Sequence, residues 1–441
     1  MKAAERDPAP VMPTHELARS ALHPSLGEPV LGAINFLNEI IDRFPEAISF
    51  APGAPAPALL EPIDVAADLE TYVAHLCSVE GLSVAQVRRR LFQYGPSRGI
   101  INGLIADALA RDQGIEVPPA AIVVTVGFQE AMLLALRAIY SSPADVLVVA
   151  QPCFAGAVGA ARVLGIDVHP VDEDGEGLDV TELRALCTRL RLAGQRVRAV
   201  YVAPDHANPS GALMTRARRE ALLALAAEQD LFLFEDATYG FTAEDEETVP
   251  TLKALDRAGR VLHMGTFAKI AMPGVRVGFV VADQRVEGGT LLADALATLK
   301  SMTTVNTSPV CQAIVGGMLL KHGVSLSNLG RAKGSYYRAR LDTLLAALTR
   351  HVGDRREGAP SWNHPSGGFF VRVRVPAVVD AALLEVSARE YGVLWTPMSL
   401  FYLGGGGQHE LRLSCSYLTD AQIDEGAARL ACFLRDARVC A

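Results

Sequence analysis

Six short apolar runs, separated by stretches rich in Ala, Leu and Arg, constrain the fold of this 441-residue chain most strongly. The runs lie at 121–126, 145–150, 198–203, 231–236, 260–265 and 275–282. They are rich in β-branched residues, and runs of this length between helical segments are typical of strands in a buried, mainly parallel sheet. The sequence therefore predicts an α/β fold.

The C-terminal part has a different pattern. A long helical pattern covers 326–351, two strands with alternating polarity follow in "GGFFVRVRV" and "ELRLSCSYL", and a helix closes the chain at about 419–436. This order predicts a second, smaller α+β domain. The first 20 or so residues are rich in proline and charge, without periodicity, and are predicted to form a loose arm. We predict an N-terminal arm with a small-domain segment (1–60), a large domain (61–325) and a small C-terminal domain (326–441).

Composition narrows the function to small-molecule chemistry. Acidic residues outnumber basic ones, 49 to 41, which provides no electrostatic footprint for nucleic acid. The apolar runs are far shorter than the roughly 20 residues of a membrane span. The seven cysteines form no C-x-x-C pair, and the ten histidines show no metal-ligand spacing. We expect a cytoplasmic protein with reduced thiols, no metal, no membrane association and no nucleic-acid partner.

Chemically reactive residues lie where the predicted strands end, which is where ligands collect in parallel sheets. Lys269 stands among small and apolar residues in "GTFAKIAMPGVRVG", with Arg276 seven positions later. Loss of hydration disfavours the charged amine and makes it a usable nucleophile, as in a Schiff-base lysine. The alternative is a lysine that merely points out of a loop.

Three other strand ends carry polar groups or glycine. The run "LFLFED" ends in Glu235 and Asp236, and a carboxylate there is either a helix cap or the partner of a buried cation. Asn208 precedes a proline in a turn after the run at 198–203. Gly127 joins a strand to a helix, whose first N–H groups attract an anion.

Taken in order, these motifs resemble the class I and II branch of the pyridoxal-phosphate enzymes with the aspartate aminotransferase fold, also called fold type I. The resemblance runs from about residue 47 to the C-terminus. It is carried by "ISFAPGAPAP", "QYGPSRG", "TVGFQEA", "QPCFAGA", "PDHANPSG", "EDATYG", "GTFAKIAMPGVRVG", "PSGGFF" and "LRLSCS". It implies a large domain around a mainly parallel, seven-stranded-type sheet, a smaller α+β C-terminal domain and pyridoxal 5'-phosphate as the cofactor.

The resemblance also implies a catalytic set of Lys269, Asp236 and Tyr239. Lys269 would form the Schiff base with the cofactor and later carry the substrate proton. Asp236 would keep the pyridine nitrogen protonated, so that the ring accepts electrons. Asn208 and Tyr239 would bind the phenolate oxygen of the cofactor, and Phe154 would stack on its ring.

The remaining assignments concern two anionic groups, the α-carboxylate of the substrate and the phosphate of the cofactor. Arg412 and Gly53 would receive the α-carboxylate of the substrate. The cofactor phosphate would be bound by Gly127, Phe128, Gln129, Thr266, Arg276 and Tyr94, the last from a neighbouring subunit. The protein is therefore expected to be a homodimer. Structural alternatives are that Phe154 belongs to the core, that Arg412 faces water and that Tyr94 only packs in a turn.

Four positions depart from the family pattern. Phe128 replaces a small or hydroxylated residue, and Ala207 stands where glutamine is frequent, beside His206. Thr238 lies where proline or alanine is common under the ring, and Arg98 where an acidic or neutral residue is common. Because a histidine side chain ordinarily titrates near neutral pH, His206 is either an additional acid or base or a structural histidine. Together these positions suggest an unusual substrate or outcome.

Three functions follow as hypotheses. The first, which we predict, is an aminotransferase acting on an amino acid and a 2-oxo acid. The second is a specialised enzyme of secondary metabolism that performs cyclisation, β- or γ-replacement or oxidation through the same quinonoid intermediate. The third is a regulator, which needs an N-terminal DNA-binding module of about 70 residues. The segment before residue 47 is too short and too rich in proline for one.

Overall fold

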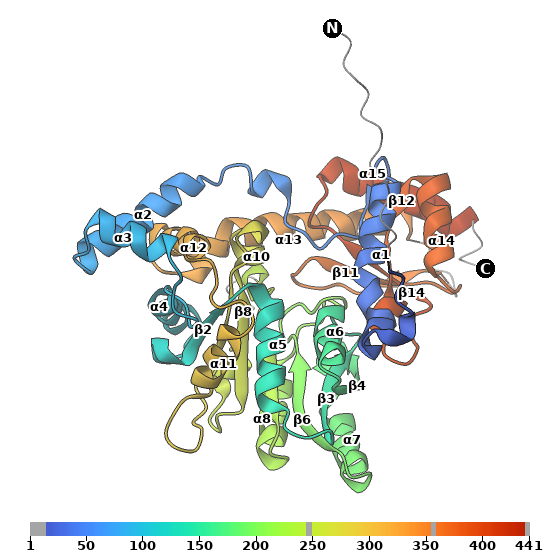
Figure 1. Ribbon diagram of the computed structural model, residues 1–441. Helices are drawn as coiled ribbons and strands as arrows, with labels where there is room; N and C mark the ends of the chain where they lie inside the picture. Colours follow the sequence, from blue (N-terminus) through green and yellow to red (C-terminus); the bar gives the residue numbers. More distant parts are fainter. Residues whose placement is uncertain (1–14, 244–248, 354–358, 437–441) are drawn as a thin grey trace.

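The computed structural model describes residues 15–243, 249–353 and 359–436 (Figure 1). Residues 1–14, most of the predicted arm, lie outside the described residues. The larger sheet has the strand order β2-β9-β8-β7-β6-β3-β4-β5. Its strands are β2 (Ile122–Thr125), β3 (Asp145–Gln151), β4 (Asp167–Asp174), β5 (Gly177–Leu178), β6 (Arg196–Val202), β7 (Phe232–Asp236), β8 (Val261–Thr266) and β9 (Gly278–Val281).

The sheet is mainly parallel, as predicted. The neighbours β8, β7, β6, β3 and β4 all run parallel, whereas β9 runs antiparallel to both β2 and β8. Seven strands correspond to the predicted sheet, and the two-residue β5 adds an antiparallel edge. All six predicted strands are present. The strand β4 was not predicted, because "DVHPVDED" contains Pro170 and four acidic residues and is only partly buried.

Helices cover both faces of this sheet. Along β3, Leu147 and Val149 pack on one face with α5 (Gly127–Ile139), α6 (Ala155–Val163) and α11 (Leu292–Ser301). Val146 and Val148 pack on the other face with α7 (Val180–Leu192) and α8 (Arg216–Glu228). Because successive strand side chains point to opposite faces, one apolar run supplies both cores.

A smaller sheet with the order β10-β11-β14-β13 lies at one end of the molecule, beside α14 and α15 (Figure 1). Its strands are β10 (Ser361–Trp362), β11 (Phe370–Arg374), β13 (Thr396–Pro397) and β14 (Glu410–Ser414). The helices α13 (Leu326–His351) and α15 (Asp420–Asp436) confirm the two predicted C-terminal helices, and α14 covers Ala381–Val386. The pairing of β1 (Ile48–Ser49) with β12 (Val393–Leu394) places the end of the N-terminal segment against this part. The domain boundaries themselves stay a prediction.

The remaining helices are α1 (Pro29–Arg43), α2 (Val65–Val79), α3 (Val84–Phe92), α4 (Asn102–Gln113), α9 (Leu252–Leu255), α10 (Phe267–Ile270) and α12 (Pro309–Lys321). Among the described residues, no helix has the length and apolarity to cross a membrane.

Two glycines allow α12 to pack closely on α2. A Cβ atom on Gly317 would overlap the carbonyl oxygen of Asp68, and one on Gly316 would lie 2.6 Å from the ring of Tyr72. The obstacle at Gly317 is backbone, which cannot rotate away.

We therefore expect Gly317→Ala to lower the free energy of unfolding by about 1–3 kcal/mol, the usual cost of overpacking. Gly103→Ala is the matched control, since Gly103 lies in α4 and nothing is within 4 Å of its added Cβ. That change should be neutral or stabilise the helix by up to about 1 kcal/mol. Denaturant unfolding of both variants measures the difference, and equal stabilities would contradict the packing argument.

Candidate active site

Lys269 lies in α10, directly after the end of β8. Its Nζ donates a hydrogen bond to the carbonyl oxygen of Gly53 at 2.6 Å. Burial, with smaller contributions from the positive charges of Arg412 and Arg276, lowers the pKa of Lys269 to about 8, against the opposing effect of Asp236. The amine is therefore partly neutral near physiological pH, so the alternative of an ordinary solvent-directed lysine is wrong.

Asp236 is the last residue of β7, and its carboxylate is buried. The hydroxyl of Tyr201 donates to Oδ2 at 2.7 Å, and the backbone N–H of Thr238 donates to Oδ1 at 3.0 Å. The Thr238 hydroxyl donates to the same Oδ1. Burial raises the pKa of Asp236, whereas these hydrogen bonds favour the ionised form.

Tyr201 is a residue that the sequence analysis missed. Its only sequence signal is a phenol within the apolar stretch "AVYVA" of β6. Thr238, noted as a departure from the family pattern, has a specific contact because both its N–H and its hydroxyl donate to Asp236.

Several groups suited to an anion come together where α5 begins. Gly127 has a φ of +73°, and a Cβ atom there would overlap Nη2 of Arg276. Gly278 pairs with Thr266 across β8 and β9, and a Cβ on Gly278 would lie 2.8 Å from the carbonyl carbon of Gly127. Thr266, Arg276 and the first turn of α5 are thus brought together, with N–H groups of Phe128 and Gln129 in that turn.

Arg412 lies on β14 and is 5% exposed. Its Nη1 donates to Oδ1 of Asn208 at 2.8 Å, and its Nη2 donates to the carbonyl oxygen of Ala51 at 2.7 Å. The guanidinium lies over the rings of Phe370 and Phe401, 4.3 and 4.9 Å from their centroids. Burial lowers the pKa of Arg412 to about 10. The alternative that Arg412 faces water is therefore wrong.

Tyr239, Phe154 and Gly53 also lie at this edge of the sheet. Burial, followed by the charge of Asp236, raises the pKa of Tyr239 well above its usual range. Phe154 precedes α6, and its ring meets that of Phe128 edge to face at 6.4 Å. A Cβ on Gly53 would lie 2.8 Å from the ring of Phe370, so this position needs glycine.

Tyr94 differs from the other predicted residues. It is 85% exposed in this chain. The structure therefore places it at the surface, where its own subunit does not enclose it.

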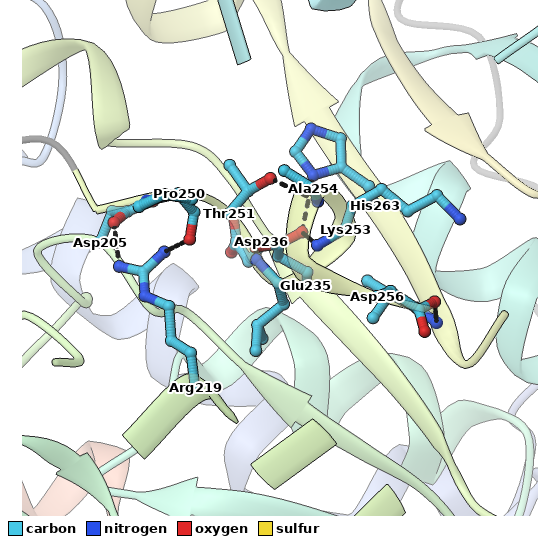
Figure 2. Close-up of polar contacts among 12 residues, drawn as sticks. Asp205, Arg219, Glu235, Asp236, Pro250, Thr251, Lys253, Ala254, Asp256 and His263 are labelled. Atoms are coloured by element: carbon cyan, nitrogen blue, oxygen red, sulfur yellow. Dashed lines mark hydrogen bonds and ion pairs between the residues drawn. The ribbon is translucent and has the colours of Figure 1, made fainter. Parts of the chain in front are cut away.

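Figure 2 shows the polar contacts of Glu235 and its neighbours, beside Asp236 at the end of β7. Glu235 accepts hydrogen bonds from the backbone N–H groups of Leu252 and Lys253 at 2.6 and 3.0 Å and contacts Nδ1 of His263 at 2.8 Å. Burial raises the pKa of Glu235, but these partners outweigh it and hold the pKa below its usual value. Of the two alternatives, Glu235 corresponds to the helix cap, because it accepts from the first two N–H groups of α9 beside the N-cap residue Thr251.

Two departures from the family pattern have structural contacts. The ring of His206 is buried against the loop before β11, where a Cβ on Gly367 would lie 2.6 Å from its Nε2. Arg98 donates to Asp294 and to the carbonyl oxygen of Ala120. Neither contact points to a catalytic role.

The residues present fit pyridoxal phosphate. They include an amine of lowered pKa for the aldehyde, a buried carboxylate for the pyridine nitrogen and a helix start with an arginine for the phosphate. Only glycine at position 127 leaves space beside Arg276. In addition, Nε of Arg412 is buried without a partner in the described residues, so a donor remains for a further acceptor.

Comparisons with known proteins agree with this geometry. The family model described as "Aminotransferase class I and II" matches residues 71–430. The chain is 45% identical over 419 residues to an (S)-3,5-dihydroxyphenylglycine transaminase of Amycolatopsis orientalis, covering 95% of each chain. It is 32% identical over 391 residues to a 2-aminoadipate transaminase of Thermus thermophilus, covering 88% of this chain and 89% of that one.

Solved structures give the same result. A kynurenine aminotransferase of Pyrococcus horikoshii, in complex with PMP, superposes with a TM-score of 0.80 at 27% identity, over 96% of this chain and 97% of that one. Together, the family match and the near-full-length similarity to a curated transaminase show that this chain belongs to the class I and II aminotransferases, which use pyridoxal phosphate and have the aspartate aminotransferase fold.

Proposed function

We propose that this aminotransferase takes its amino group from an α-amino acid with an aromatic side chain, first of all an arylglycine, and passes it to a 2-oxo acid. The observation that carries the reaction type is the half-buried Lys269, whose amine lies 2.6 Å from the Gly53 carbonyl oxygen and interacts electrostatically with Asp236 and Arg412. Support for the substrate class comes from the dihydroxyphenylglycine transaminase and the kynurenine aminotransferase. The aromatic rings beside Arg412 agree with it.

The cofactor supplies an aldehyde that captures amines and a ring that withdraws electrons. In our assignment, Asp236 holds a proton at the pyridine nitrogen, and Tyr201 and Thr238 keep its carboxylate in place. Asn208 uses its Oδ1 for Arg412, so its amide N–H groups are left to donate to the phenolate oxygen, together with the Tyr239 hydroxyl.

The phosphate and ring contacts are assigned in the same way. The phosphate accepts hydrogen bonds from the N–H groups at the start of α5, from the guanidinium of Arg276 and from the hydroxyl of Thr266. Phe154 covers one face of the pyridine ring. The residues of the phosphate site are Gly127, Phe128, Gln129, Thr266 and Arg276.

Arg412 binds the α-carboxylate of the substrate in this assignment. Its unpartnered Nε is a donor for that anion, and Phe370 and Phe401 exclude water from the pair. Gly53 leaves room for the carboxylate to approach the backbone. The Lys269 amine, once free, carries a proton from the substrate Cα, because its lowered pKa lets it accept and release protons near neutrality.

We infer further that the enzyme is a cytoplasmic homodimer. Tyr94 is exposed in a segment that also exposes Phe92, and a Cβ on Gly95 would lie 3.4 Å from Pro309 at the start of α12. Apolar side chains gathered on one surface favour a protein contact. A second copy would cover them and receive Tyr94 at its phosphate site.

The first test measures amino-group transfer with (S)-3,5-dihydroxyphenylglycine, kynurenine and 2-aminoadipate as donors. We expect the arylglycine to have the highest kcat/KM and Lys269→Ala to lower kcat by roughly 10³-fold or more. Lys321→Ala is the control, because Lys321 pairs with Asp68 far along α12. Borohydride reduction and peptide mapping should label Lys269. Labelling of another lysine contradicts the site, and a preference for 2-aminoadipate contradicts the substrate class.

The second test follows the ionisation of Lys269 in cofactor-free protein. At a pH below its pKa an amine is protonated and unreactive. The rate of acylation of Lys269 should therefore rise with pH and reach half its maximum near pH 8, the pKa to which burial lowers this amine. An ordinary lysine would do so near 10.4. Arg276→Gln removes a positive charge and should move the midpoint to higher pH. Mass spectrometry of the labelled peptide measures it, and a wild-type midpoint above pH 10 would rule out the buried amine.

The third test concerns the dimer. Tyr94→Ala and Lys269→Ala should each be nearly inactive alone. After mixing and subunit exchange, half of the dimers are mixed and carry one intact site of two, so activity should return to about a quarter of wild type. Sedimentation supplies the mass. A fully active monomer, or no recovery despite exchange, would overturn the assignment of Tyr94 to the partner site.

A further inference from the structure

A separate cavity of about 530 Å³ lies between the two sheets. One wall comes from the end of β4 and the turn after Asn208, with Glu173 and Ser210. The other comes from the smaller sheet and the loop before β11, with Trp362 and Arg374. None of the residues assigned to the cofactor or the substrate lines it.

Two residues that line this cavity each have a buried polar atom without a partner among the described residues. One atom is Oε1 of Glu173, an acceptor, and the other is Nε1 of Trp362, a donor. Buried polar atoms are almost always hydrogen-bonded, because an unmet group loses its hydration without compensation. An acceptor on one wall and a donor on the opposite wall fit a ligand that has both functions.

The two arginines that line the cavity differ in how many of their N–H groups already have a hydrogen-bond partner. Arg372 donates to Glu410 through Nε at 2.8 Å and through Nη2 at 2.5 Å, and its Nη2 also donates to the Tyr402 hydroxyl at 2.7 Å. Arg374 contacts Glu410 only through Nε, at 3.1 Å, and its side chain is 65% exposed. The terminal nitrogens of Arg374 therefore remain for an anion.

Glu173 is the available acid on the opposite wall, since its neighbour Asp174 is bound to Arg218 at 2.9 Å. Burial raises the pKa of Glu173 to about 7, while Ser210 and Arg372 act in the opposite direction. A cation placed beside it would favour its carboxylate form. A simple anion would face Glu173, and a simple cation would face Arg374, so neither suits both walls.

We propose that this cavity is a second ligand site, which binds a free α-amino acid as a zwitterion. The ammonium group contacts Glu173, and the carboxylate contacts Trp362 Nε1 and Arg374. Because the ligand contacts both sheets, its binding is coupled to their arrangement, and the site serves regulation by an amino acid rather than turnover.

The test uses calorimetry on holoenzyme that has been reduced with borohydride, so that the cofactor no longer reacts with amines. Glycine and L-phenylalanine are the probes, and acetate and methylammonium are the singly charged controls. We expect one saturable site per chain for the amino acids, with Glu173→Gln and Trp362→Phe each weakening it about tenfold or more. Glu176→Gln is the matched control, because Glu176 lies in the turn between β4 and β5 with a 59% exposed side chain, and this variant should bind the amino acids normally.

Tryptophan emission provides a second measurement. The chain has two tryptophans, and Trp395 is fully buried, with its Nε1 donating to Ser387 at 3.1 Å. A saturable change in emission on adding amino acid, absent in Trp362→Phe, would therefore report on this cavity. The bound cofactor's absorbance before reduction verifies that each variant is folded.

Three results would overturn the proposal: no saturable heat with either amino acid, equal binding in Glu173→Gln, or binding that Arg412→Lys abolishes while Glu173→Gln keeps it. The last result would assign the heat to the substrate site. The reaction type is judged separately, from the lysine labelled by borohydride, so failure of this site and failure of the proposed function are distinguishable.

Discussion

The geometry of this site depends on the hydrogen bonds that the buried guanidinium of Arg412 donates. This guanidinium joins β14 of the smaller sheet to Asn208 beside the larger sheet and to the backbone of Ala51 near the N-terminus. A guanidinium offers several donors in one plane, so a single side chain can hold three distant segments. Burial of this charge is tolerated because of those acceptors and the two aromatic rings that cover it.

The carboxylates at the end of β7 show how one strand serves structure and chemistry together. Glu235 and Asp236 are adjacent, so their side chains point to opposite sides of the strand. Glu235 accepts hydrogen bonds at the start of α9 and contacts His263. Asp236 instead accepts hydrogen bonds from Tyr201 and Thr238 and interacts electrostatically with Lys269. Each buried charge has partners of its own, which lets the two acids lie next to each other.

Most of the fold was predictable from local patterns. Buried strands of the larger sheet stand out as apolar runs, and α13 and α15 follow a helical period, so their positions agree closely with the structure. The strand β4 was not predictable, because its exposed, acidic half lacks that pattern and its pairing with β3 decides it. The family motifs predicted the site residues, and the roles of these residues stay predictions.

The sequence by itself determined the reactive groups and their order: an amine among apolar residues, a carboxylate closing a strand, a glycine before a helix and an arginine in a late strand. These are local properties, set by each residue and its neighbours. Only the tertiary structure decided that Tyr201 holds Asp236, that Arg412 is buried against Asn208, and that Glu173 and Trp362 share a cavity. Such contacts join segments far apart in the chain, and burial, which depends on the whole packed fold, changes the pKa values of the groups it encloses.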